Sequence, residues 1–299
     1  MHKIFKSIYL STDSNLIMNK KIKNIFLNSP FKSVKHSSYF YAYEELFSDF
    51  VDKELTFVEV GILNGGSLFM WKNYFGKKAR IIGIDNNPDS KCSEKFGFEI
   101  HIGNQADPNF WSKFHKKVGK IDILLDDGGH FDIQQATTLF ENISYINDGG
   151  LIVIEDTHAS YLKKFGNPNK KSFMNLVFNL TNKLNYRSGV LEQHNKKCLK
   201  QPISQIRIFE SICAFKIDRG HSSISKKLEN NGKNLNMKDH RHEDTSRKQV
   251  DKFYLLFGFL KKIPLIGKIL KYFFVNFLRE KIYILAIKKE RKKIEKYFF

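Results

Sequence analysis

The feature that most constrains the fold is a series of short apolar runs, most of which end in a glycine or an acidic residue. The runs are rich in Val, Ile and Leu, as buried strands are, and segments with helical periodicity follow several of them. Strands that alternate with helices in this way form a parallel, doubly wound sheet. In chain order the runs are FVEVGI (57–62), ARIIGID (79–85), FEIHI (98–102), KIDILLDD (120–127), LIVIED (151–156) and RIFESICAFKI (207–217).

Polar groups gather at the carboxyl ends of four of these runs. In an open parallel sheet, ligands bind outside those ends. We therefore expect an α/β, Rossmann-like, mostly parallel sheet whose strand ends face one crevice. The groups concerned are Glu59 with Gly61, Asp85, Asp126 with Asp127, and Glu155 with Asp156.

The chain divides into four zones. Residues 1–35 are basic and mixed, and are expected to form an arm or cap, whereas residues 36–217 carry the strand and helix signals. Residues 218–249 are polar, with few large apolar side chains, which predicts a flexible linker. Residues 250–299 return to apolar residues interleaved with lysines and predict a basic helical extension.

The charge balance indicates an anionic partner or a compositional bias. The chain of 299 residues has 50 Lys and Arg against 31 Asp and Glu, a formal net charge of +19. An acidic membrane, a charged glycan or a nucleic acid would fit such an excess, and so would a genome that favours lysine codons. No nucleic-acid recognition module is visible, so no nucleic-acid partner is expected.

Cysteine usage and hydropathy indicate a cytoplasmic protein. Cys92, Cys198 and Cys213 are widely spaced and form no CxxC pair, so neither a disulfide framework nor a zinc site is expected. The N-terminus lacks the apolar core of a signal peptide, and no run approaches the roughly 18 apolar residues of a spanning helix. We expect a soluble or peripheral protein.

The segment Glu59–Ser67 predicts a nucleoside-binding loop. Its glycines let the backbone approach a ligand, and the helix that follows presents free N–H groups. Asp85, at the end of the next strand, is suited to accept two ribose hydroxyls, and the loop Gly103–Asp107 is placed to hold an adenine. The spacing EVGxxxGGS differs from GxGxxG, which disfavours a nicotinamide cofactor. The alternative is a purely structural role for these residues: Gly61 would only close a turn, and residues 103–107 would form an ordinary polar turn.

The acidic residues at 127, 155 and 156 predict a metal site. Three carboxylates that converge at one sheet edge repel one another unless a cation neutralises them, and Mg²⁺ prefers such oxygen ligands. The alternative is two solvated acidic pairs on the surface.

Six segments in order resemble the macrolide-sugar O-methyltransferases, which methylate deoxysugar hydroxyls of mycinamicin-type and tetracenomycin-type compounds. The cephalosporin-hydroxylase-like proteins share this core. The resemblance covers about residues 36–161 and weakens towards residue 217. The segments are HSSYFYAYEELF, FVEVGILNGGSLFMWKNYF, GIDNNP, GNQADPNFW, LLDDGGH and GGLIVIEDTHASY.

The resemblance implies the class I methyltransferase fold, S-adenosylmethionine as methyl donor, and roles for individual residues. It implies that Tyr39 and Tyr43 lie in a segment that folds over the cofactor. The family's DDGSH stands here as DDGGH, and the oligomerisation domain that precedes the core in some relatives is not expected, so their assembly is not carried over. The implied roles are metal ligand for Asp127, Glu155 and Asp156, general base for His130, and cofactor contact for Glu59, Gly61, Ser67, Asp85, Gln105 and Asp107, with Asp126 assigned to the cofactor as well.

The expected chemistry is metal-assisted transfer of a methyl group to a hydroxyl. A sugar hydroxyl is a very weak acid, and Mg²⁺ chelated by two vicinal hydroxyls would lower its pKa. His130 could then accept the proton near neutral pH. Two alternatives stay open: His130 could instead orient Asp127, and His158 could be the base.

The last fifty residues predict an anionic-membrane contact. Lys261, Lys262, Lys268 and Lys271 interrupt the apolar runs, which favours lying at a bilayer surface over spanning it, and Pro264 should divide the helix. The alternative is a helical pair packed on the core or on a second subunit. Peripheral attachment at the inner face of the membrane would suit a lipid-linked acceptor.

The sequence therefore predicts a metal-assisted S-adenosylmethionine-dependent O-methyltransferase acting on a sugar or glycoconjugate. Two other readings remain: a methyltransferase for another small molecule, and an inactive methyltransferase fold serving as a membrane-associated partner protein. The acceptor and the oligomeric state, including a homo-oligomer, stay open.

Overall fold

The structure is a computed structural model that describes residues 22–191, 194–233, 235–237 and 279–298. Contacts divide the chain into two compact units, Met1–Leu228 and Glu229–Phe299. The first unit contains the sheet and the site.

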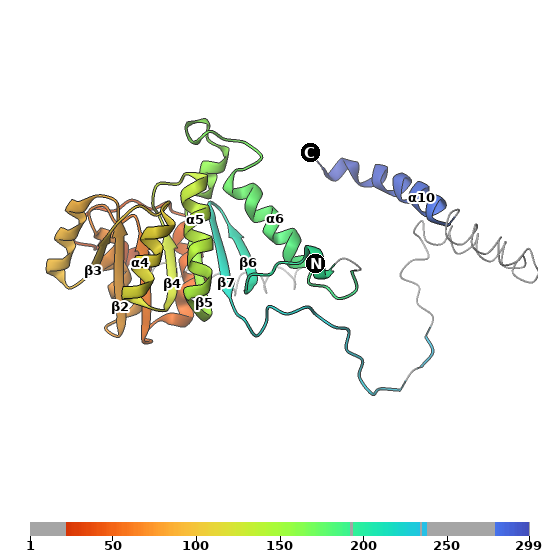
Figure 1. The fold of residues 1–299 in the computed structure, drawn as a ribbon, viewed down its shortest axis with the longest axis horizontal. Coiled ribbons are helices and arrows are strands. Elements are labelled where there is room, and N and C mark those ends of the chain that lie inside the picture. Colours follow the sequence, from red (N-terminus) through yellow and green to blue (C-terminus); the bar gives the residue numbers. More distant parts are fainter. Residues whose placement is uncertain (1–21, 192–193, 234, 238–278, 299) are drawn as a thin grey trace, which may run out of the picture. The chain divides into compact units, whose positions relative to one another are not determined.

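The first unit is built on a seven-stranded sheet with the order β3-β2-β1-β4-β5-β7-β6 (Figure 1). Strands β1 to β5 pair in parallel, and β7 runs antiparallel to both of its neighbours. The predicted mostly parallel, doubly wound sheet is confirmed. The strands are β1 Leu55–Val60, β2 Ala79–Asp85, β3 Glu99–Ile102, β4 Ile121–Asp126, β5 Ile146–Ile154, β6 Ile203–Phe209 and β7 Ile212–Ile217.

Helices cover both faces of the sheet. Alternate residues of each strand point to opposite faces, so Phe57 of β1 joins one core cluster and its neighbour Val58 joins the other. The first cluster contains residues of α2 and α3, and the second contains residues of α4, α5 and α6; Figure 1 shows α4 and α5 in front of the sheet. The helices of this unit are α2 Tyr39–Phe47, α3 Gly66–Phe75, α4 Pro108–Val118, α5 Asp132–Asn142, α6 Phe173–Asn185 and the short α7 His194–Lys197.

The run at 207–217, expected as one strand, is a hairpin instead. Strands β6 and β7 pair antiparallel, with Phe209 opposite Ile212. The polar pair Glu210–Ser211 makes the turn, and Ser211 has a positive φ of 59°. Two polar residues inside an apolar run thus reverse the chain, and β7 enters the sheet between β5 and β6.

The second unit contains the helix α10 Arg279–Ile294. Among the described residues no helix is long and apolar enough to cross a membrane. The four lysines and the proline singled out in the tail lie outside the described residues. The zone boundaries expected at 35, 217 and 249 stay predictions.

Candidate functional site

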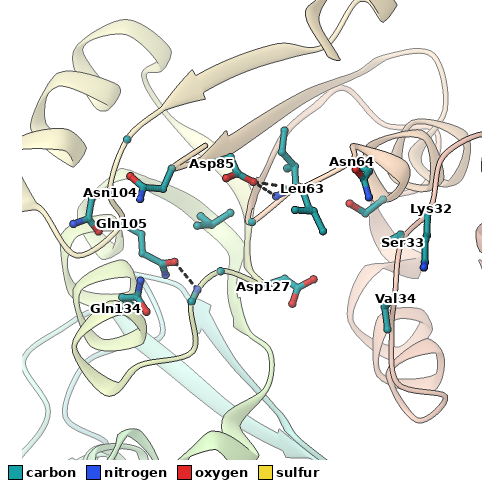
Figure 2. Close-up of a pocket in the computed structure, with 18 residues that line it drawn as sticks. Lys32, Ser33, Val34, Leu63, Asn64, Asp85, Asn104, Gln105, Asp127 and Gln134 are labelled. Carbon is teal, nitrogen blue, oxygen red and sulfur yellow. Dashed lines mark hydrogen bonds between the residues drawn. The ribbon is translucent and has the colours of Figure 1, made fainter. Parts of the chain in front are cut away.

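A cavity of about 720 Å³ opens at the carboxyl ends of β1, β2 and β4 (Figure 2). Its size is typical of small-molecule sites, which span about 300–1,000 Å³. Of the residues expected to contact a cofactor, four line it: Gly61, Ser67, Asp85 and Gln105. Asp127, expected to bind metal, lies in the same wall, and the segment 32–34 closes the opposite side.

Gly61 brings two loops into contact. It has a positive φ of 84°, and its N–H donates to the carbonyl of Ile84 at 2.8 Å. A Cβ at this position would overlap the carbonyl oxygen of Asp127. The glycine therefore does more than close a turn, because it lets the loop after β1 lie directly against the loop after β4.

Asp85 holds the same loop from the other side. Its Oδ2 accepts the N–H groups of Ile62 (3.1 Å) and Leu63 (2.9 Å), as Figure 2 shows, and its Oδ1 accepts the N–H of Asn87 at 2.9 Å. The carboxylate thus stands at the cavity wall between β1 and β2. This is where a ribose was expected.

Glu59 and Ser67 form a buried pair beneath the loop. The hydroxyl of Ser67 donates to Oε2 of Glu59 at 2.7 Å, and the Glu59 side chain is fully buried. Burial raises the pKa of Glu59 above its ordinary value. Ser67 lines the cavity, whereas Glu59 supports it from below.

Two residues assigned to the cofactor have other partners in the structure. Asp107 is the N-cap of α4 and accepts the N–H of Asn109 at 2.9 Å. Asp126 is buried, and both of its oxygens accept the side-chain amide of Gln105 at 2.9 Å. Neither carboxylate belongs to the cavity lining, while Gln105 does. A helix start and a buried amide partner therefore account for Asp107 and Asp126.

The three carboxylates expected to hold a metal lie at the ends of β4 and β5, and a lysine lies among them. The Nζ of Lys35 is 2.7 Å from Oδ2 of Asp127, 2.9 Å from Oε2 of Glu155 and 3.5 Å from Oε1 of Glu59. Only 1% of the Lys35 side chain is exposed. Sequence analysis did not single out this residue, because no local pattern separates it from the other 49 Lys and Arg residues.

The charges around Lys35 keep it protonated. Burial by itself would lower the pKa of a lysine, but the carboxylates of Asp127 and Glu155 outweigh that effect and raise the pKa of Lys35 well above its ordinary value. Tyr43 completes the cluster by donating its hydroxyl to Oε1 of Glu155 at 2.5 Å. Both carboxylate oxygens of Glu155 therefore have a protein partner.

Asp156 lies at the centre of a second cluster that contains histidines. It has a positive φ of 52°. Its Oδ2 is 3.2 Å from Nε2 of His130, and its Oδ1 is 3.7 Å from Nε2 of His36 and from Nδ1 of His158. His130 too has a positive φ, of 62°, and strained backbone of this kind concentrates at functional sites. His130 therefore lies beside Asp156 and also within 4.8 Å of Asp127, and its role as base or as partner of Asp127 stays a prediction.

The geometry fits a divalent cation on part of the expected ligand set. One ligand atom from each of Asp127, His130 and Asp156 lies within 4.8 Å of the others. Carboxylate oxygens at this spacing suit a hard cation such as Mg²⁺. Glu155 lies outside this group, and its two oxygens accept Lys35 and Tyr43. The roles expected for these residues stay predictions.

Comparison with known proteins supports the resemblance found in the motifs. No family model matches the chain. The chain is 34% identical over 137 residues to the 8-demethyl-8-alpha-L-rhamnosyl tetracenomycin-C 2'-O-methyltransferase of Streptomyces olivaceus, covering 43% of this chain and 35% of that protein. It thus spans about a third of the length of the sugar methyltransferases that it matches.

A viral protein matches over more of its own length. The chain is 30% identical over 161 residues to uncharacterized protein R132 of Acanthamoeba polyphaga mimivirus, covering 49% of this chain and 71% of that protein. The two belong to one family, and the name of the viral protein states no activity.

A solved structure supports the fold. The MycE methyltransferase of the mycinamycin biosynthetic pathway, in complex with Mg and SAH, superposes with a TM-score of 0.59 at 20% identity, covering 69% of this chain and 55% of that one. The expected class I methyltransferase fold is confirmed, and so is the resemblance to macrolide-sugar O-methyltransferases.

Proposed function

We propose that this protein transfers a methyl group from S-adenosylmethionine to a hydroxyl of a sugar or glycoconjugate, with the help of Mg²⁺. One observation carries the proposal: a cavity of cofactor size shares Asp127 with a cluster that contains Asp156 and His130. The cofactor and the reacting oxygen would therefore meet at the ends of β4 and β5. The names of the relatives, which are sugar O-methyltransferases, support the same reaction.

The cavity residues would hold the cofactor. Asp85 is placed to accept the ribose hydroxyls. Gly65 is the N-cap of α3, and Ser67, in the first turn of that helix, lines the cavity. Gln105 is held by Asp126 and by the N–H of Gly129, at 3.1 Å, and forms the wall where an adenine would lie (Figure 2).

Asp127 and Asp156 would hold the cation, which when bound supplies a Lewis acid that lowers the pKa of the acceptor hydroxyl. His130 would accept the proton. Because Nε2 of His130 lies 3.2 Å from Oδ2 of Asp156, the carboxylate would stabilise the imidazolium that forms when the imidazole accepts the proton. Holding the acceptor oxygen in line with the methyl group supplies the rest of the acceleration.

Titration calorimetry with S-adenosylhomocysteine tests the cofactor assignment. We expect saturable binding in EDTA, weakened at least about tenfold by Asp85→Asn, because a carboxylate that accepts ribose hydroxyls is a charged hydrogen-bond partner. Asp89→Asn, an exposed neighbour, is the control and should bind normally. Absence of binding by the unmodified protein, or binding of NADH instead, would refute the proposal.

Methyl transfer itself is tested with labelled S-adenosylmethionine and a panel of rhamnosides and other glycosides. We expect label in the acceptor only with Mg²⁺ present. Transfer to a phenol or an amide with none to any glycoside would move the function to another small molecule.

The basic tail would attach the enzyme to an anionic membrane on its inner, cytoplasmic side. Within the described part of the tail, α10 exposes Ile284 and Leu285 and carries basic residues in its last turn. Flotation with vesicles of phosphatidylglycerol, against phosphatidylcholine as control, tests this. Failure to float with the anionic vesicles refutes it, and light scattering on the same protein measures whether it forms a homo-oligomer.

A further inference from the structure

We propose that Lys35 is the resident counter-ion of the carboxylate cluster and keeps Glu155 out of the divalent-cation site, leaving Asp127 and Asp156 to form it. Lys35 is thus a positioning residue. The inference deepens the proposed function and rests on it for the purpose of the cation.

The ammonium group matches its surroundings. It carries three N–H donors, and three carboxylates, those of Asp127, Glu155 and Glu59, lie 2.7 to 3.5 Å from its nitrogen. Burying an ammonium group away from water without a charged partner costs a large amount of free energy. The Lys35 side chain, which is 1% exposed, therefore needs these carboxylates. The pairing explains how several acidic side chains can be buried together.

Both oxygens of Glu155 already accept a hydrogen bond. Its Oε1 accepts the hydroxyl of Tyr43 and its Oε2 accepts Lys35. Its own side chain is fully buried. A cation at Oε2 would compete with the ammonium of Lys35, and displacing Lys35 would leave a buried charge without one of its main partners, which is strongly unfavourable.

Asp127 and Asp156 are placed differently. Asp127 uses only Oδ2 for Lys35 and lies in the cavity wall, and Asp156 is partly exposed. Among the described residues, the group of possible ligands that includes Asp127 contains Asp156 and His130 but not Glu155. Asp156 accepts the Tyr39 hydroxyl on Oδ1, but its ion-pair partners among the described residues are histidines rather than Lys35. Asp127 and Asp156 are therefore the more accessible carboxylates for a cation next to the cavity.

Contacts within the first unit hold the segment that precedes Lys35 in place, and this limits the positions that the Lys35 ammonium can occupy. The hydroxyl of Ser29 donates to the carbonyl of Gly66 at 2.6 Å. The ring of Phe31 packs against those of Phe69 and Phe96, with centroids 5.4 and 5.1 Å apart. Residues 32–34 then line the cavity and lead directly into Lys35.

Binding of Mn²⁺, measured by electron paramagnetic resonance and calorimetry, tests the proposal. As single substitutions, Asp156→Asn should abolish Mn²⁺ binding, whereas Glu155→Gln should leave the Mn²⁺ affinity within about threefold of that of the unmodified protein. Lys35→Gln should tighten binding at least about tenfold, because it removes a positive charge beside Asp127 and frees Glu155. In that background, Glu155→Gln should cancel the gain.

Two further variants serve as controls. Lys35→Arg keeps the charge and should keep the original affinity. Lys23→Gln removes the same charge from an exposed position outside the cavity lining and should not change Mn²⁺ binding. Melting curves in EDTA report whether each variant folds, and if Lys35→Gln does not, the comparison of Glu155→Gln with Asp156→Asn decides.

Three results would overturn the proposal: loss of Mn²⁺ binding in Glu155→Gln comparable to that in Asp156→Asn, no gain in folded Lys35→Gln, or no Mn²⁺ binding by the unmodified protein. Binding of S-adenosylhomocysteine in EDTA is independent of these readouts. Its absence would refute the methyltransferase function, whereas its presence alongside any of the three results would refute only the role of Lys35.

Discussion

Tyr39 and Asp156 share two hydrogen bonds. The phenol hydroxyl donates to Oδ1 of the carboxylate at 2.5 Å and accepts the backbone N–H of the same residue at 3.1 Å. One side chain from α2 thus fixes both the backbone and the carboxylate of a residue whose φ is positive. Since Asp156 also lies 3.2 Å from His130, α2 fixes the carboxylate beside the residue that we propose as the base.

Tyr39→Phe should impair turnover without impairing cofactor binding. Loss of both hydrogen bonds frees Asp156 to rotate, and loss of such a supporting partner at a metal site typically costs about 10- to 100-fold in activity or metal affinity. The turnover number kcat and the affinity for S-adenosylhomocysteine are measured separately. Tyr41→Phe, on an exposed position of the same helix, is the matched control, and an equal loss in both variants would contradict the assignment.

Gly61→Ala should destabilise the protein and weaken cofactor binding. An alanine there needs a left-handed backbone, which costs about 1–2 kcal/mol, and its Cβ would also displace the Asp127 carbonyl. Gly97→Ala separates the two effects, because Gly97 has a similar φ of 86° but open space around it.

The free energy of unfolding, measured with urea, checks this pair. We expect Gly97→Ala to lose only the backbone cost and Gly61→Ala to lose more. Equal losses would show that the close approach of the two loops is unimportant for stability.

His130→Asn should abolish most of the methyl transfer. Asparagine tolerates the positive φ at this position, so the loop is kept while the base is removed. Loss of a general base costs about 10²- to 10⁴-fold. His158→Asn should lose much less; if the two losses are reversed, His158 is the base. Both variants should still bind S-adenosylhomocysteine.

Stability should fall in mild acid because of His115. Burial lowers the pKa of His115 to about 4, from an ordinary value of 6.5, and its ring stacks on Tyr145 with centroids 3.6 Å apart. The unfolded chain takes up a proton below pH 6.5, whereas the folded chain resists it until about pH 4. The contribution of neutral His115 to the free energy of unfolding is therefore fully present above pH 6.5 and is lost progressively between pH 6.5 and 4.

Most of this loss should fall between pH 7.5 and 5, because the unfolded chain takes up its proton in this interval and the folded chain does not. His115→Phe keeps an aromatic ring for the stack and should reduce the difference between the melting temperatures at these two pH values. Lys53→Gln, at an exposed position, should leave that difference unchanged. An unaltered pH dependence in His115→Phe would contradict the argument.

The sequence by itself determined the parallel strands β1 to β5 and the polar groups at their ends. Runs of β-branched residues are a local signal, and the period of two along β1 assigns Phe57 and Val58 to opposite faces without any knowledge of their partners. The strand expected at 79–85 is β2, Ala79–Asp85. The placement of Asp85 and Asp127 at one cavity follows from parallel strand order, which the alternation of strands and helices already predicts.

Only the tertiary structure decided what surrounds these groups. Lys35 lies 92 positions from Asp127 and 120 from Glu155 in the sequence. Because it stands in a basic segment, no local sequence feature predicts that its side chain is buried. The same holds for Asp107 and Asp126, whose sequence positions fit cofactor contacts. In the structure Asp107 caps the start of α4, and Asp126 accepts the side-chain amide of Gln105. Periodicity reports which face of an element is apolar, whereas the pairing of buried charges depends on which distant segments the fold brings together.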